Sequence, residues 1–135
     1  MIKKVHHIGI VVKNLDETVK LYSKMLEKQP SSQMEIAAAK IRIANYQVGG
    51  PALEFLEAGP GSPLEEFIET RGEGIHHIAF EVDNIKSELQ RLSKMGVKLV
   101  DKEPRPGPEG KIAFVGPEGA HGVYIELVQP RGEGE

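Results

Sequence analysis

Hydrophobic and polar positions follow a similar pattern in two blocks of the chain, and each pattern predicts a strand followed by a helix. Residues 5–12 and 75–82 are rich in β-branched and apolar side chains, which is typical of strands that pack on a core. Apolar residues then recur at helical spacing, at Leu15, Val19, Tyr22 and Leu26 in the first block and at Ile85, Leu89 and Leu92 in the second. Asn14 and Asn84 precede these stretches and are predicted N-caps.

Further strands are predicted after each helix. In the first block, two apolar segments flank Gly49-Gly50, which is the chemistry of a hairpin turn. In the second block, a Pro/Gly-rich loop separates the predicted strands. The segments predicted as strands are 40–47 and 51–58 in the first block and 97–101, 111–115 and 121–128 in the second.

A short helix is predicted between the two blocks, over residues of about 62–71. Ser62 is its expected cap, Pro63 takes the first helical position, and Glu65 completes a capping box. The helix is expected to end at Arg71-Gly72. The last five residues, RGEGE, are expected to fray.

The two blocks are an internal repeat. At an offset of 70 residues, eight of the 22 positions of 5–26 match those of 75–96: His6/His76, His7/His77, Ile8/Ile78, Val12/Val82, Asn14/Asn84, Ser23/Ser93, Lys24/Lys94 and Met25/Met95. Helix propensity alone does not reproduce a His-His-Ile triplet. We therefore expect one domain over residues 1–135, built from two modules of about 1–60 and 73–130.

Four polar residues stand on predicted apolar strands and obey the repeat: His7, Glu54, His77 and Glu126. Because strand side chains alternate between faces, the histidine pair shares one face while His6 and His76 point to the other. A single strand histidine is more often structural than a ligand, and a single glutamate more often faces solvent. The repeat favours convergence of all four, and two imidazoles with two carboxylates suit Zn²⁺, Mn²⁺, Co²⁺, Ni²⁺ or Fe²⁺.

Composition narrows the classes of function. The chain has no cysteine, so a metal must be held by histidine and carboxylate. Lysine and arginine total 17 against 20 acidic residues, a net charge of −3, which gives no basic excess for nucleic acid or a membrane surface. No apolar stretch reaches the roughly 18 residues of a membrane span, and no signal peptide is evident. We therefore expect a cytoplasmic protein.

Several segments together resemble a known family. They are HHIGIVV, LEFLEAG, SPLEEFIETRGEGIHHIAFEVDNI, EPRPGPEGKIAFVGPEG and HGVYIELVQ. The chain resembles the vicinal oxygen chelate superfamily over nearly its whole length and, within it, the methylmalonyl-CoA epimerases. The resemblance implies an α+β fold in which two βαβββ modules form a cupped mixed β-sheet around one metal site.

The resemblance also implies a reaction, a metal and a substrate. It implies an epimerase that interconverts (2R)- and (2S)-methylmalonyl-CoA by proton transfer at C2 through a metal-stabilised enolate. The metal ligands are then His7, His77 and Glu126, with Glu54 at the fourth position, and the metal is Co²⁺, Mn²⁺, Zn²⁺ or Ni²⁺. Arg105 and Lys111 are candidates for contacts to coenzyme A phosphates, although a solvated loop explains them more simply. A homodimer is expected.

One departure from the epimerase pattern concerns a proton-transfer base. Epimerases carry a glutamate near the position that Ala38 occupies here, and Glu35 lies three residues upstream. The catalytic candidates are therefore Glu126, Glu54 and Glu35. Two alternatives remain open: a glyoxalase I-like lyase with the same ligand set, and a small-molecule binding or resistance protein without catalysis. Filled ligand positions and scarce aromatic residues favour an enzyme.

Overall fold

The chain folds into two compact units, seen in a computed structural model. The N-terminal unit is Ile8–His76, and the C-terminal unit joins Met1–His7 to the chain from His77 onward, so strands β1 (Ile2–Val12) and β5 (Gly74–Val82) are divided between them. The structure describes residues 1–132; residues 133–135, part of the predicted frayed end, lie outside the described residues. Within residues 1–132, no helix is long and apolar enough to cross a membrane.

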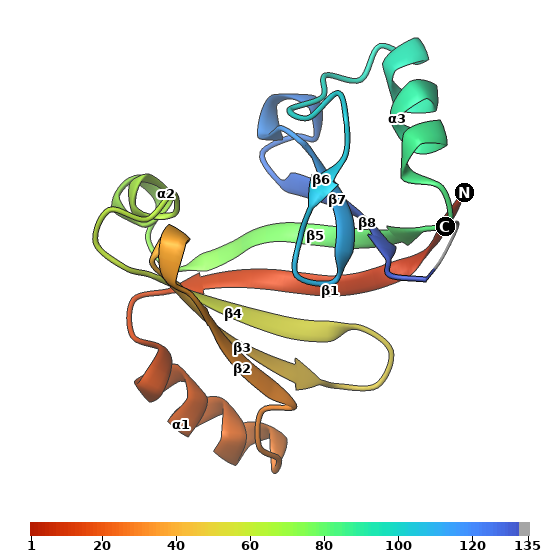
Figure 1. The fold of residues 1–135 in the computed structure, drawn as a ribbon. Coiled ribbons are helices and arrows are strands. Elements are labelled where there is room, and N and C mark those ends of the chain that lie inside the picture. The colour runs from red at the N-terminus through yellow and green to blue at the C-terminus, as the bar shows by residue number, and fades with distance from the viewer. Residues whose placement is uncertain (133–135) are drawn as a thin grey trace. The chain divides into compact units, whose positions relative to one another are not determined.

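The N-terminal unit contains the helices and strands of the first repeat, with its strands in the order β2–β3–β4–β1. Its other elements are α1 (Leu15–Leu26), β2 (Ser32–Ile36), the 3-10 turn η1 (Ala37–Ala39), β3 (Ile41–Gln47), β4 (Ala52–Ala58) and α2 (Glu65–Arg71). The antiparallel pairing of β3 with β4 closes at Gln47 and Ala52, which confirms the predicted hairpin. In Figure 1, α1 runs alongside β3 and β4.

The core beneath α1 explains why this helix forms where the pattern predicted it. The side chain of Asn14 accepts a hydrogen bond from the Glu17 amide, as an N-cap does. Apolar side chains of α1 then pack against the buried residues Val12, Leu15, Ala44, Tyr46 and Phe55. The buried Tyr46 hydroxyl is satisfied by the Val19 carbonyl at 3.2 Å and by the Ser23 hydroxyl at 2.7 Å.

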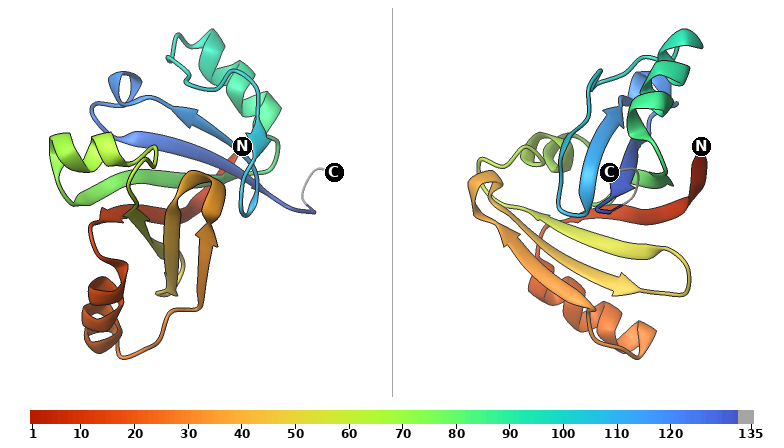
Figure 2. Two further views of the ribbon diagram at one scale, coloured as in Figure 1. Left: turned by 60° about the vertical axis from the view of Figure 1, so that its left-hand side comes forward. Right: turned by 45° about the vertical axis from the view of Figure 1, so that its right-hand side comes forward.

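The C-terminal unit contains the second repeat, with its strands in the order β1–β5–β8–β7–β6. Its other elements are α3 (Ile85–Lys94), β6 (Arg105–Pro106), β7 (Gly110–Val115), the 3-10 turn η2 (Pro117–Gly119) and β8 (Tyr124–Pro130). Strands β5 and β8 are parallel, whereas β7 is antiparallel to β8. Helix α3 covers β7 and β8 (Figure 2), where its buried Ile85 and Leu89 pack with Val82, Ala113 and Leu127.

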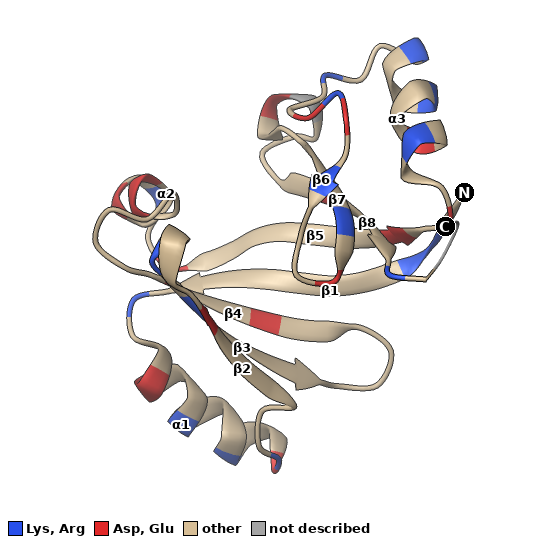
Figure 3. Ribbon diagram, in the orientation of Figure 1, with Lys and Arg blue, Asp and Glu red and all other residues tan. Residues whose placement is uncertain are grey.

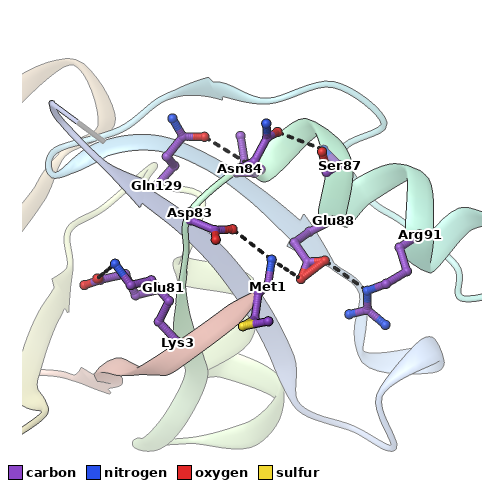
Figure 4. A network of polar contacts seen from close by, with 10 residues as sticks. Met1, Lys3, Glu81, Asp83, Asn84, Ser87, Glu88, Arg91 and Gln129 are labelled. Carbon is purple, nitrogen blue, oxygen red and sulfur yellow. Dashed lines mark hydrogen bonds and ion pairs between the residues drawn. The ribbon is translucent and has the colours of Figure 1, made fainter. Parts of the chain in front are cut away.

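Ion pairs within the C-terminal unit hold the Met1 ammonium group, just before β1, against Asp83 and helix α3 (Figure 4). The Met1 ammonium group lies 2.8 Å from Asp83 and 3.0 Å from Glu88. Glu88 is buried on α3, and the Arg91 guanidinium donates to its carboxylate at 2.9 Å. Burial raises the pKa of Glu88, but the hydrogen bonds from Arg91 and the Met1 ammonium outweigh burial and leave the pKa below its usual value.

The structure differs from the sequence prediction in its strands. Residues 97–101 do not form a strand; Leu99 makes one isolated bridge with Val115. The amides of Val100 and Asp101 both donate to the Phe114 carbonyl, and the Asp101 carboxylate accepts from the Phe114 amide, so the side chain takes the place of a continued ladder. Strand β2 was not predicted, because four of its five residues are exposed and give no apolar alternation.

The predicted cap of the linking helix is also wrong. Helix α2 begins at Glu65, its N-cap is Leu64, and it ends at Arg71 before Gly72 as expected. The Glu65 amide donates to the main-chain carbonyl of Ser62, and the Glu65 carboxylate accepts from the Gly61 amide. The Ser62 hydroxyl therefore does not cap the helix; it is buried and has no hydrogen-bond partner.

Candidate metal centre

Three of the four predicted ligands meet inside the C-terminal unit. His7 stands on β1, His77 on β5 and Glu126 on β8, with exposed fractions of 3%, 4% and 4%. Parallel pairing places Glu126 opposite Ala79, two residues along β5 from His77 and therefore on the same face. The alternation that we expected from the sequence thus positions all three side chains.

The three side chains offer one donor atom each to a common point. The Nε2 atoms of His7 and His77 are 3.1 Å apart. The Glu126 Oε1 atom lies 3.3 Å from the His7 Nε2 and 3.2 Å from the His77 Nε2. Ligands at about 2.1 Å from a divalent ion stand roughly 3.0–3.4 Å from one another in octahedral or tetrahedral arrangements. The triangle therefore has the size of one face of a metal's coordination shell.

Electrostatics favour a cation at this point. A carboxylate and two imidazole nitrogens that present lone pairs repel one another unless a proton or a metal ion lies between them. All three groups are buried, so little water is available to screen this repulsion. The residues present therefore fit a divalent ion bound by two histidines and one carboxylate.

The far side of the His7 ring contacts His6. The Nδ1 atoms of the two rings are 2.8 Å apart, and the Glu109 carboxylate lies 4.0 Å from the His7 Nδ1. Burial is the largest of the effects that lower the pKa of His6 below its usual 6.5, and a neutral His6 can accept a hydrogen bond. Strand alternation did not predict this contact, because it places adjacent side chains on opposite faces. The Nδ1 atoms lie on the part of each ring nearest the backbone, where adjacent rings can still touch.

His76 behaves differently from His6. Its ring packs edge-to-face on Phe67 within the N-terminal unit, with centroids 4.8 Å apart. His77 instead packs on Phe114 of the C-terminal unit, with centroids 5.9 Å apart. The two adjacent histidines of β5 therefore have separate surroundings, as expected from strand alternation.

The remaining site candidates lie in the N-terminal unit. Glu54 is on β4, where it is buried with an exposed fraction of 6% and pairs in register with Asn45. Glu35 is exposed on β2 and pairs in register with Arg42. Ala38, near which the resemblance places a glutamate of the epimerases, is exposed in η1.

Comparison with protein families identifies the superfamily of the chain. Residues 6–115 match the model of the glyoxalase/bleomycin resistance protein/dioxygenase superfamily. The chain belongs to this superfamily. The matched region includes His7 and His77 and ends before Glu126. The choice of Glu126 as a candidate ligand is therefore based on its distances to the two histidines. The α+β fold of two strand–helix–three-strand repeats is the glyoxalase-like fold that the sequence predicted.

Relatives within the superfamily include epimerases. The chain is 36% identical over 132 residues to the uncharacterized protein YqjC of Bacillus subtilis, covering 96% of this chain and 94% of that protein. It is 29% identical to the ethylmalonyl-CoA/methylmalonyl-CoA epimerase of Cereibacter sphaeroides, covering 96% and 99%. Among solved structures, Streptomyces coelicolor methylmalonyl-CoA epimerase with 2-nitronate-propionyl-CoA matches at a TM-score of 0.88 and 28% identity, covering 98% of each chain.

Proposed function

We propose that this member of the superfamily is a metal-dependent epimerase that interconverts (2R)- and (2S)-methylmalonyl-CoA. The observation that carries the proposal is the buried triangle of His7, His77 and Glu126, with donor atoms 3.1–3.3 Å apart. The similarity to epimerases over nearly the whole chain supports the choice of substrate. The triangle alone would suit a lyase as well.

The chemistry of the substrate explains why such a centre is useful. The C2 proton of methylmalonyl-CoA is flanked by a thioester and a carboxylate, and its removal leaves an enolate. A divalent ion held by the three side chains would supply Lewis-acid stabilisation of the negative charge on the enolate oxygens. The Nε2 atoms of His7 and His77 face each other at this point, and a hydrogen bond from the His7 Nδ1 to His6 would hold the His7 ring in the tautomer that leaves Nε2 free for the ion.

Inversion at C2 requires a proton donor or acceptor on each side of the planar enolate. We propose that Glu126 serves one side, since its second carboxylate oxygen is not needed for the triangle. Glu54 and Glu35 are the candidates for the other side, and Glu54 is also the proposed fourth ligand. The repeat relation between Glu54 and Glu126, at an offset of 72 residues, supports that assignment, whereas Glu35 is supported by its nearness in sequence to Ala38.

The proposal is tested by offering the metal-loaded protein two substrates. Methylmalonyl-CoA of one configuration should become a mixture of both epimers. A coupling enzyme that accepts only the epimer formed would measure this conversion. The hemithioacetal of methylglyoxal and glutathione should remain unchanged. Turnover of the hemithioacetal without epimerisation would assign the lyase instead. The expected cytoplasmic homodimer stays a prediction, which sedimentation of the purified protein and fractionation of cells would test.

A further inference from the structure

The surface of the C-terminal unit has a hollow that the metal centre does not account for. It lies between the first turn of α3 and the edge formed by β6 and β7, and it has a volume of about 460 Å³. Four of its lining residues carry positive charge: Lys86, Arg105, Lys111 and Arg131. The others are prolines and glycines, so no acidic residue of the described chain lines it.

This concentration of positive charge contrasts with the net charge of the whole chain. The chain as a whole carries a net charge of −3, so cations are not in general excess. Figure 3 shows basic segments along α3 and around β6 and β7. An adjoining hollow of about 470 Å³ shares Lys86 and adds Lys94 and Lys102, with Glu103 as its acidic member. Among the charged residues that line the two hollows, six are basic and one is acidic.

Local contacts hold two of the four cations in place. The Arg105 guanidinium lies over the Phe114 ring, 5.4 Å from its centroid, and its Nε is 3.3 Å from the Asp101 carboxylate. The Arg131 guanidinium donates to the Pro108 carbonyl at 3.1 Å. Because these groups are already oriented, less side-chain entropy is lost when they bind an anion.

The same contacts connect the hollow to the metal centre. Phe114 touches Arg105 on one side and packs against His77 on another, with ring centroids 5.9 Å apart. In register, Phe114 also pairs with Glu126 across β7 and β8. Phe114 therefore lies between Arg105, one cation of the hollow, and His77, and all these residues belong to one unit.

We propose that this hollow, lined by Lys86, Arg105, Lys111 and Arg131, binds the phosphate groups of an acyl-CoA substrate. The proposal rests on the proposed function, since it places the phosphate end of the substrate of that site. Coenzyme A carries a pyrophosphate and a further phosphate, which together need several cations. Arginine offers paired donors to phosphate oxygens, and lysine supplies a mobile point charge.

The test measures binding of free coenzyme A, which has phosphates but no acyl group, by calorimetry. Lys111→Ala combined with Arg131→Ala should weaken binding by about tenfold to a hundredfold, because two charge-assisted contacts to phosphate are lost. Lys20→Ala with Lys24→Ala, an equal charge change on the exposed side of α1, should leave the affinity unchanged. Added salt should weaken binding to the wild type more than to the Lys111/Arg131 variant.

Two further ligands show whether the phosphate groups are what the hollow recognises. They also show whether the Lys111/Arg131 variant is correctly folded. Phosphate-free pantetheine should bind the wild type and the Lys111/Arg131 variant equally. Pyrophosphate alone should compete with coenzyme A for the wild type. Equal affinity of the wild type and the variant for coenzyme A, or no binding by the wild type, would overturn the proposal.

The two proposals fail in different ways. Epimerase activity with a KM for methylmalonyl-CoA that the Lys111/Arg131 variant leaves unchanged would keep the function and remove this phosphate site. Coenzyme A binding that depends on Lys111 and Arg131, without epimerase activity, would keep the phosphate site and remove the reaction.

Discussion

His6 and His7 are neighbours on one strand, and their Nδ1 atoms are 2.8 Å apart. The Nε2 of His7 faces His77 and Glu126, so the contact with His6 lies on the opposite side of the ring. A histidine that binds metal through Nε2 carries its proton on Nδ1, and a neutral His6 can accept that proton in a hydrogen bond. Such partners hold the tautomer and the orientation of a ligand.

Substitution of His7 and of His6, one at a time, distinguishes the metal ligand from its hydrogen-bond partner. His7→Ala should abolish tight binding of Co²⁺, because one of three donor atoms is lost. His6→Ala should weaken binding by about tenfold to a hundredfold, the usual effect of removing such a partner. Calorimetric titration and the visible spectrum of the Co²⁺ protein measure both effects.

The matched control for that pair is His6→Asn, whose side-chain oxygen can again accept a hydrogen bond. It should recover part of the affinity that His6→Ala loses. Wild-type affinity in His6→Ala would show that the contact does not support the metal centre. Equal loss in the two alanine variants, at equal stability, would mean that His6 is itself a ligand.

Glu126→Gln tests whether this residue is both ligand and base. An amide oxygen can still coordinate a metal, so part of the metal affinity should remain. A neutral amide is a poor base, so exchange of the C2 proton should fall by at least about a hundredfold. Metal content and deuterium uptake, measured on the same sample, check the two halves. Undiminished exchange would assign the base to another residue.

The base on the other side of the enolate is identified by stereochemistry. A variant that lacks one base should exchange the C2 proton of one epimer with deuterated solvent and yet fail to invert it. We expect this behaviour from Glu54→Gln or from Glu35→Gln, but not from both. Glu54→Gln with this behaviour would indicate a symmetric pair of bases, whereas Glu35→Gln would indicate that the segment before η1 supplies the base. Full inversion in both variants would exclude both residues.

A pH-dependent stability is expected from the pair of Glu57 and Arg42. The Glu57 carboxylate accepts two bonds of 2.9 Å from Arg42 and one of 2.7 Å from the Leu15 amide, which joins β4 and β3 to the start of α1. The Arg42 hydrogen bonds lower the pKa of Glu57 below its usual 4.5, although partial burial opposes them. The stabilisation is therefore present above pH 4.5 and is lost as the pH falls through the lowered pKa.

Glu57→Gln should consequently lower the free energy of unfolding by about 1–2 kcal/mol at pH 7. At a pH below the lowered pKa, the wild type and the variant should have nearly equal stability. Denaturant unfolding at both pH values measures the difference. Glu17→Gln is the control, since that side chain is exposed on α1. A difference between wild type and Glu57→Gln that does not change with pH would contradict the role of the charged pair.

The sequence predicted the repeated elements because their apolar spacing is regular and their caps are specific. Asn14 and Asn84 cap the two helices as expected, and the predicted hairpin forms around Gly49-Gly50. Strand β2 gave no signal because its side chains are exposed, so main-chain pairing with β3 alone defines it. The cap of α2 was mistaken because a main-chain carbonyl takes the place of the Ser62 hydroxyl.

The convergence of His7, His77 and Glu126 could be predicted because repeat symmetry and strand alternation both constrain it. The histidine pair shares one position of the repeat, and Glu126 stands on an otherwise apolar strand. The contact between His6 and His7, and the cationic hollow, depend on how rings and loops lie in space. Neither feature has a periodic pattern in the sequence. The adjacency of His6 and His7 was the one sequence signal for the contact between their rings.

The central claim is that a divalent metal at His7, His77 and Glu126 activates the C2 proton of methylmalonyl-CoA. The most direct measurement follows deuterium uptake at C2 in deuterated water, with protein stripped of metal and then restored with Co²⁺. The account predicts exchange that is absent without metal, returns with Co²⁺ and stays absent in Co²⁺-treated His7→Ala. Metal-loaded wild-type protein that exchanges no C2 proton, or exchange that is equally fast without metal, would contradict it.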